Sequence, residues 1–215
     1  MIHPDTELRF ISPEVGFGVF ATKPIPRGTV VWVLCRLDKV MSVAEVDALP
    51  PAYQPIIERY AYVDSHGDYV LCWDIGRNVN HSCDPTLMGV GHDFEMAVRD
   101  IQPGEEITCE YGGLNLSGRL KCYCGSPQCR GSVSGDDVLH HWQAWDARVA
   151  DSLKYAPQVV QPILGYARNP NQFWAWVHGT EQLPSNREYH AGGTSIADDV
   201  SSRPWALRGR LAGGE

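Results

Sequence analysis

Short runs rich in β-branched and other apolar residues recur over the first 135 positions, and turn residues separate these runs. Pro and Gly punctuate the chain, for example at Pro103-Gly104 before one of the runs. This pattern is typical of strands joined by turns. We therefore predict a mainly β fold for this part of the chain, with strands over residues 29–34, 69–73, 95–99 and 106–109.

Helical spacing interrupts this pattern once. Ser42 and Glu45, three residues apart, have the arrangement of a capping box, and apolar residues follow at positions 43, 46 and 49. This predicts a short helix that ends at Pro50-Pro51. A second short helix is expected over residues 53–60.

Helical spacing dominates after the strand region. Apolar residues recur every three or four positions over residues 136–153, which predicts a helix. We expect another helix over residues 158–167 despite Pro162. Four tryptophans are expected to pack in the core, at positions 142, 145, 174 and 176. From about residue 181 the chain is rich in Ser, Gly, Pro and charged residues, which predicts disorder.

Composition narrows the partners and the compartment. The chain has 215 residues and a net charge of -8, which favours a basic partner and disfavours direct nucleic-acid binding. No run approaches the ~20 apolar residues of a membrane span, and residues 1–9 lack the apolar core of a signal peptide. We therefore expect an intracellular protein without membrane contact, acting in the cytoplasm, with the nucleus as the alternative. In a reducing compartment, the seven cysteines indicate thiols or metal ligands.

Three cysteines lie close together around a Gly-Ser-Pro turn, at Cys122, Cys124 and Cys129. A structural zinc ion takes four thiolate or imidazole ligands, so one ligand must come from elsewhere. The residues considered for this role are the histidines and Cys35, Cys72, Cys83 and Cys109. Cys83 is the best of them because it lies in a polar turn, whereas the other three lie in apolar runs typical of buried thiols.

Two further segments carry polar chemistry. Asn80-His81-Ser82-Cys83-Asp84-Pro85 concentrates hydrogen-bonding and ligating side chains in one turn, although backbone capping alone would explain such a turn. Tyr111 ends a strand and precedes two glycines. Tyr60 and Tyr62 form another aromatic pair. Core packing would explain each of these tyrosines taken singly.

The order of these segments resembles the SET-domain lysine methyltransferases that carry a post-SET zinc loop. The resemblance rests on Gly16-Phe17-Gly18, Asn80-His81-Ser82-Cys83, Gly104-Glu105-Glu106-Ile107, Tyr111-Gly112 and the later cysteine triplet. It covers about residues 8–133. It implies small curved sheets with a knot-like active site, a SET domain over residues 8–118 with a helical insert at about 42–68, and a zinc loop over 119–133. A helical extension over 134–178 and a disordered tail over 179–215 would follow.

The resemblance also implies a function. The chain would transfer a methyl group from S-adenosyl-L-methionine to a lysine amine of a protein or peptide. Cofactor contacts would come from Gly16, Phe17, Gly18, Asn80, His81 and Tyr111. The active-site tyrosine would be Tyr111, with Tyr60 or Tyr62 as its partner. Structural Zn²⁺ would be bound by Cys83, Cys122, Cys124 and Cys129.

Two departures from the family pattern leave an alternative open. Thr86 stands where many members have Asn, and Cys109 replaces the aromatic residue that often influences how many methyl groups are added. The alternative is a catalytically inactive SET fold that serves as a zinc-stabilised interaction module. A zinc-binding nucleic-acid module is disfavoured by the acidic charge.

Overall fold

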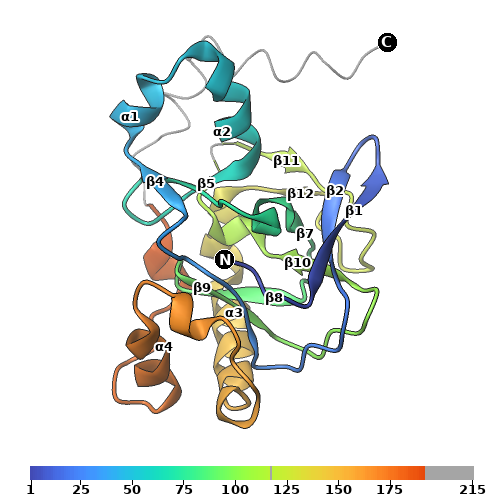
Figure 1. The fold of residues 1–215 in the computed structure, drawn as a ribbon, viewed down its shortest axis with the longest axis vertical. Coiled ribbons are helices and arrows are strands. Elements are labelled where there is room, and N and C mark those ends of the chain that lie inside the picture. The colour runs from blue at the N-terminus through green and yellow to red at the C-terminus, as the bar shows by residue number, and fades with distance from the viewer. Residues whose placement is uncertain (117, 192–215) are drawn as a thin grey trace.

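Three small sheets form the body of the protein in the computed structural model, which describes residues 1–116 and 118–191 (Figure 1). The first sheet has the order β1-β2-β10-β7, with β1 at Thr6–Ser12, β2 at Gly16–Ala21, β10 at Glu106–Cys109 and β7 at Asn80–His81. The second has the order β3-β9-β8, with β3 at Val30–Val33, β9 at Phe94–Ala97 and β8 at Leu87–Val90. The third has the order β4-β6-β5, with β4 at Lys39–Met41, β6 at Tyr69–Leu71 and β5 at Ala61–Val63. The predicted strands are confirmed, and β10 has the predicted bounds.

One strand pairing brings two distant motifs together. β7 runs parallel to β10, with Asn80 opposite Thr108 and His81 opposite Cys109. Because β10 leads directly into Tyr111, the Asn-His segment lies beside the strand that carries the tyrosine. The predicted adjacency of these two motifs is therefore present.

The insert between the sheets is helical, as predicted, and lies at the top of the molecule in Figure 1. α1 spans Val43–Asp47 and α2 spans Gln54–Tyr60, with a single 3₁₀ turn between them at Pro51–Tyr53. The capping box is formed, because Ser42 Oγ accepts from Glu45 N at 3.3 Å and Glu45 Oε2 accepts from Ser42 N at 2.8 Å.

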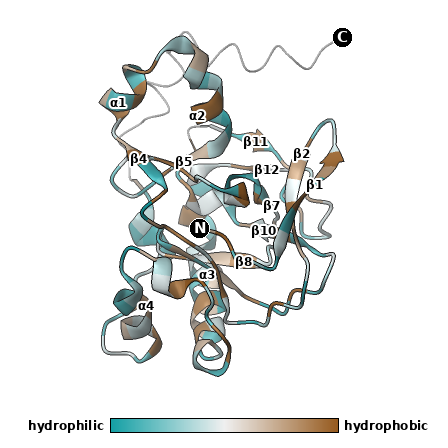
Figure 2. Ribbon diagram, in the orientation of Figure 1, coloured by the Kyte–Doolittle hydropathy of each residue, from teal (hydrophilic) through white to brown (hydrophobic). Residues whose placement is uncertain are grey.

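The C-terminal extension shares the core of the second sheet. α3 spans Val138–Leu153, within the predicted bounds, and Figure 2 shows brown and teal patches along it, as expected for a helix with one buried face. α4 spans Pro170–Val177, where the aromatic residues stand. Phe173 is fully buried and its ring lies 5.4 Å from that of Phe94. Trp145 is buried and the other three tryptophans pack against the same cluster, which confirms their predicted role.

The helix expected over residues 158–167 is wrong. Only single 3₁₀ turns form there, at Ala156–Gln158 and Leu164–Tyr166. Pro162 lacks the N–H that a helix needs. The side-chain amide of Gln161 hydrogen-bonds to backbone at the start of β3 and just before it. Gln161 Oε1 accepts from Val30 N at 2.8 Å, and Nε2 donates to Gly28 O at 2.8 Å.

The predicted disorder does not fit residues 179–191. A 3₁₀ turn at Asn186–Tyr189 has its own capping box, and Asn186 N and Nδ2 each donate to Asp146 Oδ1 on α3 at 2.8 Å. Residues 192–215 lie outside the described residues. Among the described residues, none of the helices has the length and apolar character needed to cross a membrane.

Candidate functional site

A cavity of about 170 Å³ lies where the first and second sheets, the helical insert and the C-terminal extension meet. All three predicted catalytic tyrosines line it, together with Cys109. The opposite wall includes Trp145 of α3 and Tyr189 of the C-terminal segment. The structure therefore brings Tyr60, Tyr62 and Tyr111 to one cavity, and it adds walls from a region outside the resemblance.

Two tyrosine hydroxyls are fixed by backbone carbonyls. Tyr111 Oη donates to Val79 O at 2.7 Å, and Tyr62 Oη donates to His92 O at 3.1 Å. Burial, followed by the charges of neighbouring groups, raises the pKa of both phenols well above the usual value. Each oxygen therefore stays protonated at neutral pH and has lone pairs left as hydrogen-bond acceptors.

Asn115 attaches the C-terminal segment to the cavity wall. Its φ of 51° lies in the left-handed region, and its Nδ2 donates to the carbonyls of Val63 and Asp64 at 3.2 Å each and of Tyr189 at 3.0 Å. Tyr189 in turn lies against His92, with ring centroids 5.1 Å apart. These contacts hold the tail segment in place and explain why sequence composition alone failed there.

A carboxylate missed by the sequence analysis also lines the cavity. Glu95 lies on β9 between two fully buried residues, Phe94 and Met96. Its Oε2 is buried and has no hydrogen-bond partner in the described part of the chain. Burial, with a smaller effect from the charge of Glu110, raises the pKa of Glu95 to about 8. The only sign of Glu95 in the sequence was a single acidic residue within an apolar predicted strand.

The predicted cofactor residues form a second group beside the cavity. Asn80 Nδ2 donates to Phe17 O at 3.1 Å and to Glu106 Oε1 at 2.8 Å, which joins the glycine segment to β10. A Cβ on Gly18 would lie 2.6 Å from Glu106 Oε1, so any larger residue there would displace the carboxylate that Asn80 binds. Gly16 has a φ of 86° and would bring a Cβ within 2.9 Å of Arg59, which lines the cavity. Of the predicted cofactor residues, only Tyr111 lines the cavity itself.

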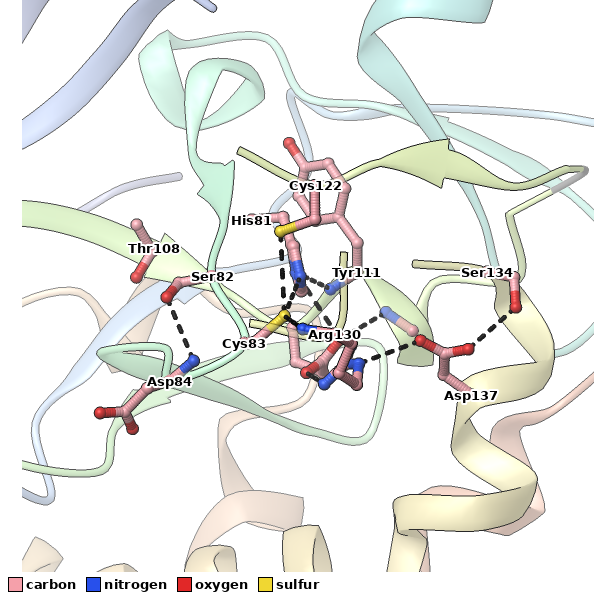
Figure 3. Close-up of polar contacts among 12 residues, drawn as sticks. His81, Ser82, Cys83, Asp84, Thr108, Tyr111, Cys122, Arg130, Ser134 and Asp137 are labelled. Atoms are coloured by element: carbon pink, nitrogen blue, oxygen red, sulfur yellow. Dashed lines mark hydrogen bonds and ion pairs between the residues drawn. The ribbon is translucent and has the colours of Figure 1, made fainter. Parts of the chain in front are cut away.

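The imidazole of His81 connects the cysteine cluster to Tyr111 (Figure 3). Its Nδ1 accepts from Tyr111 N at 3.2 Å, which leaves Nε2 as the protonated nitrogen, 3.4 Å from Cys83 Sγ. The predicted cofactor contact of the His81 side chain is not favoured by these partners. The backbone of His81 in β7 remains available for that contact.

The four predicted zinc ligands converge. Their sulfur atoms all lie within 4.8 Å of one another, and Cys83 Sγ lies 3.8 Å from Cys122 Sγ. Tetrahedral zinc with Zn–S bonds of ~2.3 Å requires S–S separations of about 3.8 Å, so the set fits the ion. The pair β11 (Leu120–Lys121) and β12 (Ser132–Val133) closes the loop that carries three of these cysteines. Cys35, Cys72 and Cys109 are buried free thiols, as predicted.

The thiol pKa values of the cluster bear on whether it can bind a cation. Burial raises the pKa of Cys83 and Cys122. Burial would raise that of Cys124 too, but hydrogen bonds from backbone amides and neighbouring thiols lower it to about 6. Thiolates bind metal and buried thiolates repel one another, so all four sulfur atoms would ionise only with a positive ion between them.

A buried ion pair joins the cysteine loop to the cavity wall. Arg130 follows Cys129, and its guanidinium donates to both oxygens of Glu110, at 2.9 and 2.7 Å. Arg130 Nε also lies 3.2 Å from Asp137 Oδ2, just before α3 (Figure 3). Glu110 precedes Tyr111 and accepts from Gly112 N at 2.9 Å. The loop, the tyrosine and the C-terminal helix are therefore one hydrogen-bonded unit.

The hydroxyl of Thr86, one of the two departures noted in the sequence, is fully hydrogen-bonded. Its Oγ1 donates to Thr108 O at 3.1 Å and accepts from Thr108 N at 2.9 Å, and both groups are buried. The hydroxyl therefore completes the hydrogen bonding between the Asn-His turn and β10.

Comparisons with known proteins agree with this geometry. The family model of the SET domain matches residues 16–112. Histone-lysine N-methyltransferase TRX1 of Oryza sativa subsp. japonica is 42% identical over 89 residues, which are 38% of this chain and 8% of that protein. Histone-lysine N-methyltransferase, H3 lysine-9 specific, of Schizosaccharomyces pombe is 29% identical over 160 residues, which cover 59% of this chain and 32% of that protein.

The chain thus spans only a small part of the length of these relatives. The crystal structure of the methyltransferase domain of human histone-lysine N-methyltransferase SETMAR resembles this structure with a TM-score of 0.44 and 24% identity, over 61% of this chain and 57% of that one. Residues 16–112 of this chain match the SET-domain family, the Asn-His strand lies beside Tyr111, and the four converging cysteines are compatible with a post-SET zinc site.

Proposed function

We propose that the protein transfers a methyl group from S-adenosyl-L-methionine to the side-chain amine of a lysine in a protein substrate. The observation that carries this proposal is the cavity, because two buried tyrosine hydroxyls line it and the Asn80–His81 strand lies next to it. The relatives named above, whose names describe histone-lysine methylation, support the same reaction.

The glycine segment of β2 supports a cofactor site at the edge of this cavity. A side chain at Gly18 would displace Glu106, and Asn80 holds the carbonyl of Phe17 in place. Arg59, beside Gly16, offers a cation to a carboxylate such as that of the methionine part of the cofactor. The backbone of His81 completes the set of residues that would hold the cofactor. The cofactor would supply an electrophilic methyl group.

The tyrosines would orient the amine. Both hydroxyl protons are donated to carbonyls, so the oxygens accept hydrogen bonds from an N–H of the substrate. The raised pKa of Tyr111 favours this orienting role and disfavours a phenolate base. Most of the rate acceleration would therefore come from positioning and from desolvation of the amine.

The zinc ion would have a structural role. It would fix the loop of residues 122–129 and, through Arg130 and Glu110, the position of Tyr111. All four ligand positions would be occupied by thiolates, which leaves no position open for a substrate.

The substrate would be a basic segment of a protein. The net charge of -8 and the histone-directed names of the relatives support a lysine-rich segment such as a histone tail. Action on histones would place the protein in the nucleus, and action on other proteins in the cytoplasm. The interaction-module alternative rested on Thr86 and Cys109, and the complete hydrogen bonding of Thr86 weakens it.

Transfer of a labelled methyl group tests the proposal. Wild type and Tyr111→Phe would be incubated with S-adenosyl-L-methionine labelled on its methyl group, using core histones and poly-lysine as acceptors. We expect label in lysine and a loss of about 100-fold or more in Tyr111→Phe, because a group that orients the reacting atoms is removed. Full activity of Tyr111→Phe would remove Tyr111 from the mechanism. Label in no acceptor, with the cofactor bound, would support the interaction module.

A further inference from the structure

The cavity contains an acidic group that neither the family resemblance nor the proposed function uses. Glu95 lies opposite Trp32 on β3 and opposite Gly89 on β8 in the second sheet. The backbone of β9 therefore pairs with both neighbouring strands. The side chain of Glu95 lines the cavity, and it forms no ion pair in the part of the chain described. Its Oε2 is buried without a partner in the part of the chain described.

A buried carboxylate oxygen without a partner is costly, because water is removed and nothing replaces it. Three neighbouring carboxylates do have partners: Glu110 binds Arg130, Asp137 binds Ser134 and lies beside Arg130, and Glu106 binds Asn80. The unused acceptor of Glu95 therefore indicates a donor that arrives with a ligand.

The groups around Glu95 indicate that this ligand would be positively charged. Burial raises the pKa of the tyrosines and thiols that share the cavity, and the charge of Glu95 adds a smaller effect; these groups are Tyr62, Tyr111, Cys72 and Cys109. None of these groups is a cation. The guanidinium groups that line the cavity, Arg59 and Arg77, lie over the ring of Tyr60. Among the described residues, no ion pair reaches Glu95, so a cationic ligand would complete the site.

We propose that Glu95 binds the ammonium group of the substrate lysine and accepts its proton before methylation. This inference rests on the proposed function for the identity of the substrate. In the step, one N–H bond of the ammonium breaks and one O–H bond forms on Glu95. The ion pair becomes a neutral amine and a neutral carboxyl group, and total charge is unchanged. The amine then has the lone pair that methyl transfer requires.

Burial makes this proton transfer feasible. The free lysine ammonium has a pKa of ~10.4, and an ordinary carboxylate would be too weak a base to deprotonate it. Burial raises the pKa of Glu95 to about 8, which narrows the difference. An apolar cavity also lowers the pKa of the ammonium, since it penalises that charge. Tyr62 and Tyr111, fixed as acceptors, would orient the amine that results.

The proposal predicts how the binding of a lysine side-chain fragment depends on pH. n-Butylammonium stays protonated to about pH 9, whereas Glu95 goes from mostly protonated at about pH 6.5 to mostly ionised at about pH 9. Among the other groups at the cavity, burial lowers the pKa of His92 and raises that of Tyr189 to about 12. Burial also raises the pKa of Glu58 above that of an ordinary carboxyl, so the Glu95→Gln variant is needed to assign the pH dependence to Glu95.

The experiment measures binding of n-butylammonium and of neutral n-butanol by NMR titration of the full chain. In wild type, we expect n-butylammonium affinity to rise about tenfold from pH ~6.5 to pH ~9, and n-butanol affinity to stay constant. Glu95→Gln should abolish the rise. Glu181→Gln, an exposed carboxylate bonded to Gln172, is the matched control and should behave as wild type.

Two results would overturn the proposal. One is that wild type does not bind n-butylammonium, or binds it with an affinity that does not change with pH. This result can be established with the wild type alone. The other is a pH-dependent rise that persists in a folded Glu95→Gln. Failure here is distinct from failure of the proposed function, because S-adenosyl-L-methionine binding and methyl transfer are measured separately. If transfer occurs, its pH profile should lose the acidic limb near pH 8 in Glu95→Gln, an effect that altered packing would not produce.

Discussion

Glu110 and Glu95 both line the cavity, and the chain surrounds these two carboxylates differently. Glu110 accepts hydrogen bonds from two nitrogens of the Arg130 guanidinium and from Gly112 N. Glu95 has an oxygen without any such partner among the described residues. The paired carboxylate joins the cysteine loop to Tyr111, whereas the unpaired one keeps its binding capacity for a ligand. Burial alone therefore does not tell a structural carboxylate from a functional one; the partners do.

The largest change is expected from removing a zinc ligand. Cys124→Ser should lose the metal and about 4 kcal/mol or more of the free energy of unfolding, because metal binding and folding of the loop are linked. Elemental analysis and urea unfolding measure both quantities. Cys35→Ala, which removes a buried thiol outside the cluster, should keep one zinc per chain. A metal-free wild type of equal stability would contradict the zinc site.

Substitution of the paired carboxylate should come next. Glu110→Gln leaves the charge of Arg130 in a largely buried position, so we expect a loss of about 3–5 kcal/mol of the free energy of unfolding. Urea unfolding at neutral pH measures it, with Glu181→Gln as an exposed control. A loss below about 1 kcal/mol would mean that the ion pair does not hold the loop to the tyrosine.

Substitution of the unpaired carboxylate should have the opposite sign. The pKa of Glu95 is about 8 in the folded protein and near its ordinary value of 4.5 when unfolded. Its neutral form is therefore favoured by folding, and stability falls as pH rises between these two values. Glu95→Gln should remove this fall and be more stable than wild type at about pH 9, by on the order of 2–4 kcal/mol. Parallel unfolding curves at about pH 6 and pH 9 would contradict it.

The sequence predicted the elements whose signal is local. The Ser42 capping box, the periodicity of α3 and the spacing of the cysteine triplet each lie within a few residues, and each appears as expected. Cys83 was chosen as fourth ligand because of its polar turn, and it converges with the other three. The motifs also identified the tyrosines that meet at the cavity.

Features that depend on distant partners were missed. No helix forms around Gln161 and Pro162, because the side chain of Gln161 hydrogen-bonds to the backbone of Val30 and Gly28, more than a hundred positions away. Residues 179–191 are held in place by Asn115, whose left-handed φ has no clear sequence signal. The significance of Glu95 arises only when the walls of the cavity are assembled around it. Pairwise contacts of this kind are set by tertiary structure and not by local pattern.

The most direct test of the proposed cofactor site is calorimetric titration with S-adenosyl-L-methionine of the zinc-loaded protein, beside the Asn80→Ala variant. Asn80 is the side chain that joins the glycine segment to β10. We predict saturable binding by wild type with one site per chain, and binding about tenfold weaker or more in the variant. Absence of binding in a folded, zinc-loaded wild type would contradict the proposed methyltransferase activity and leave the interaction module as the better account.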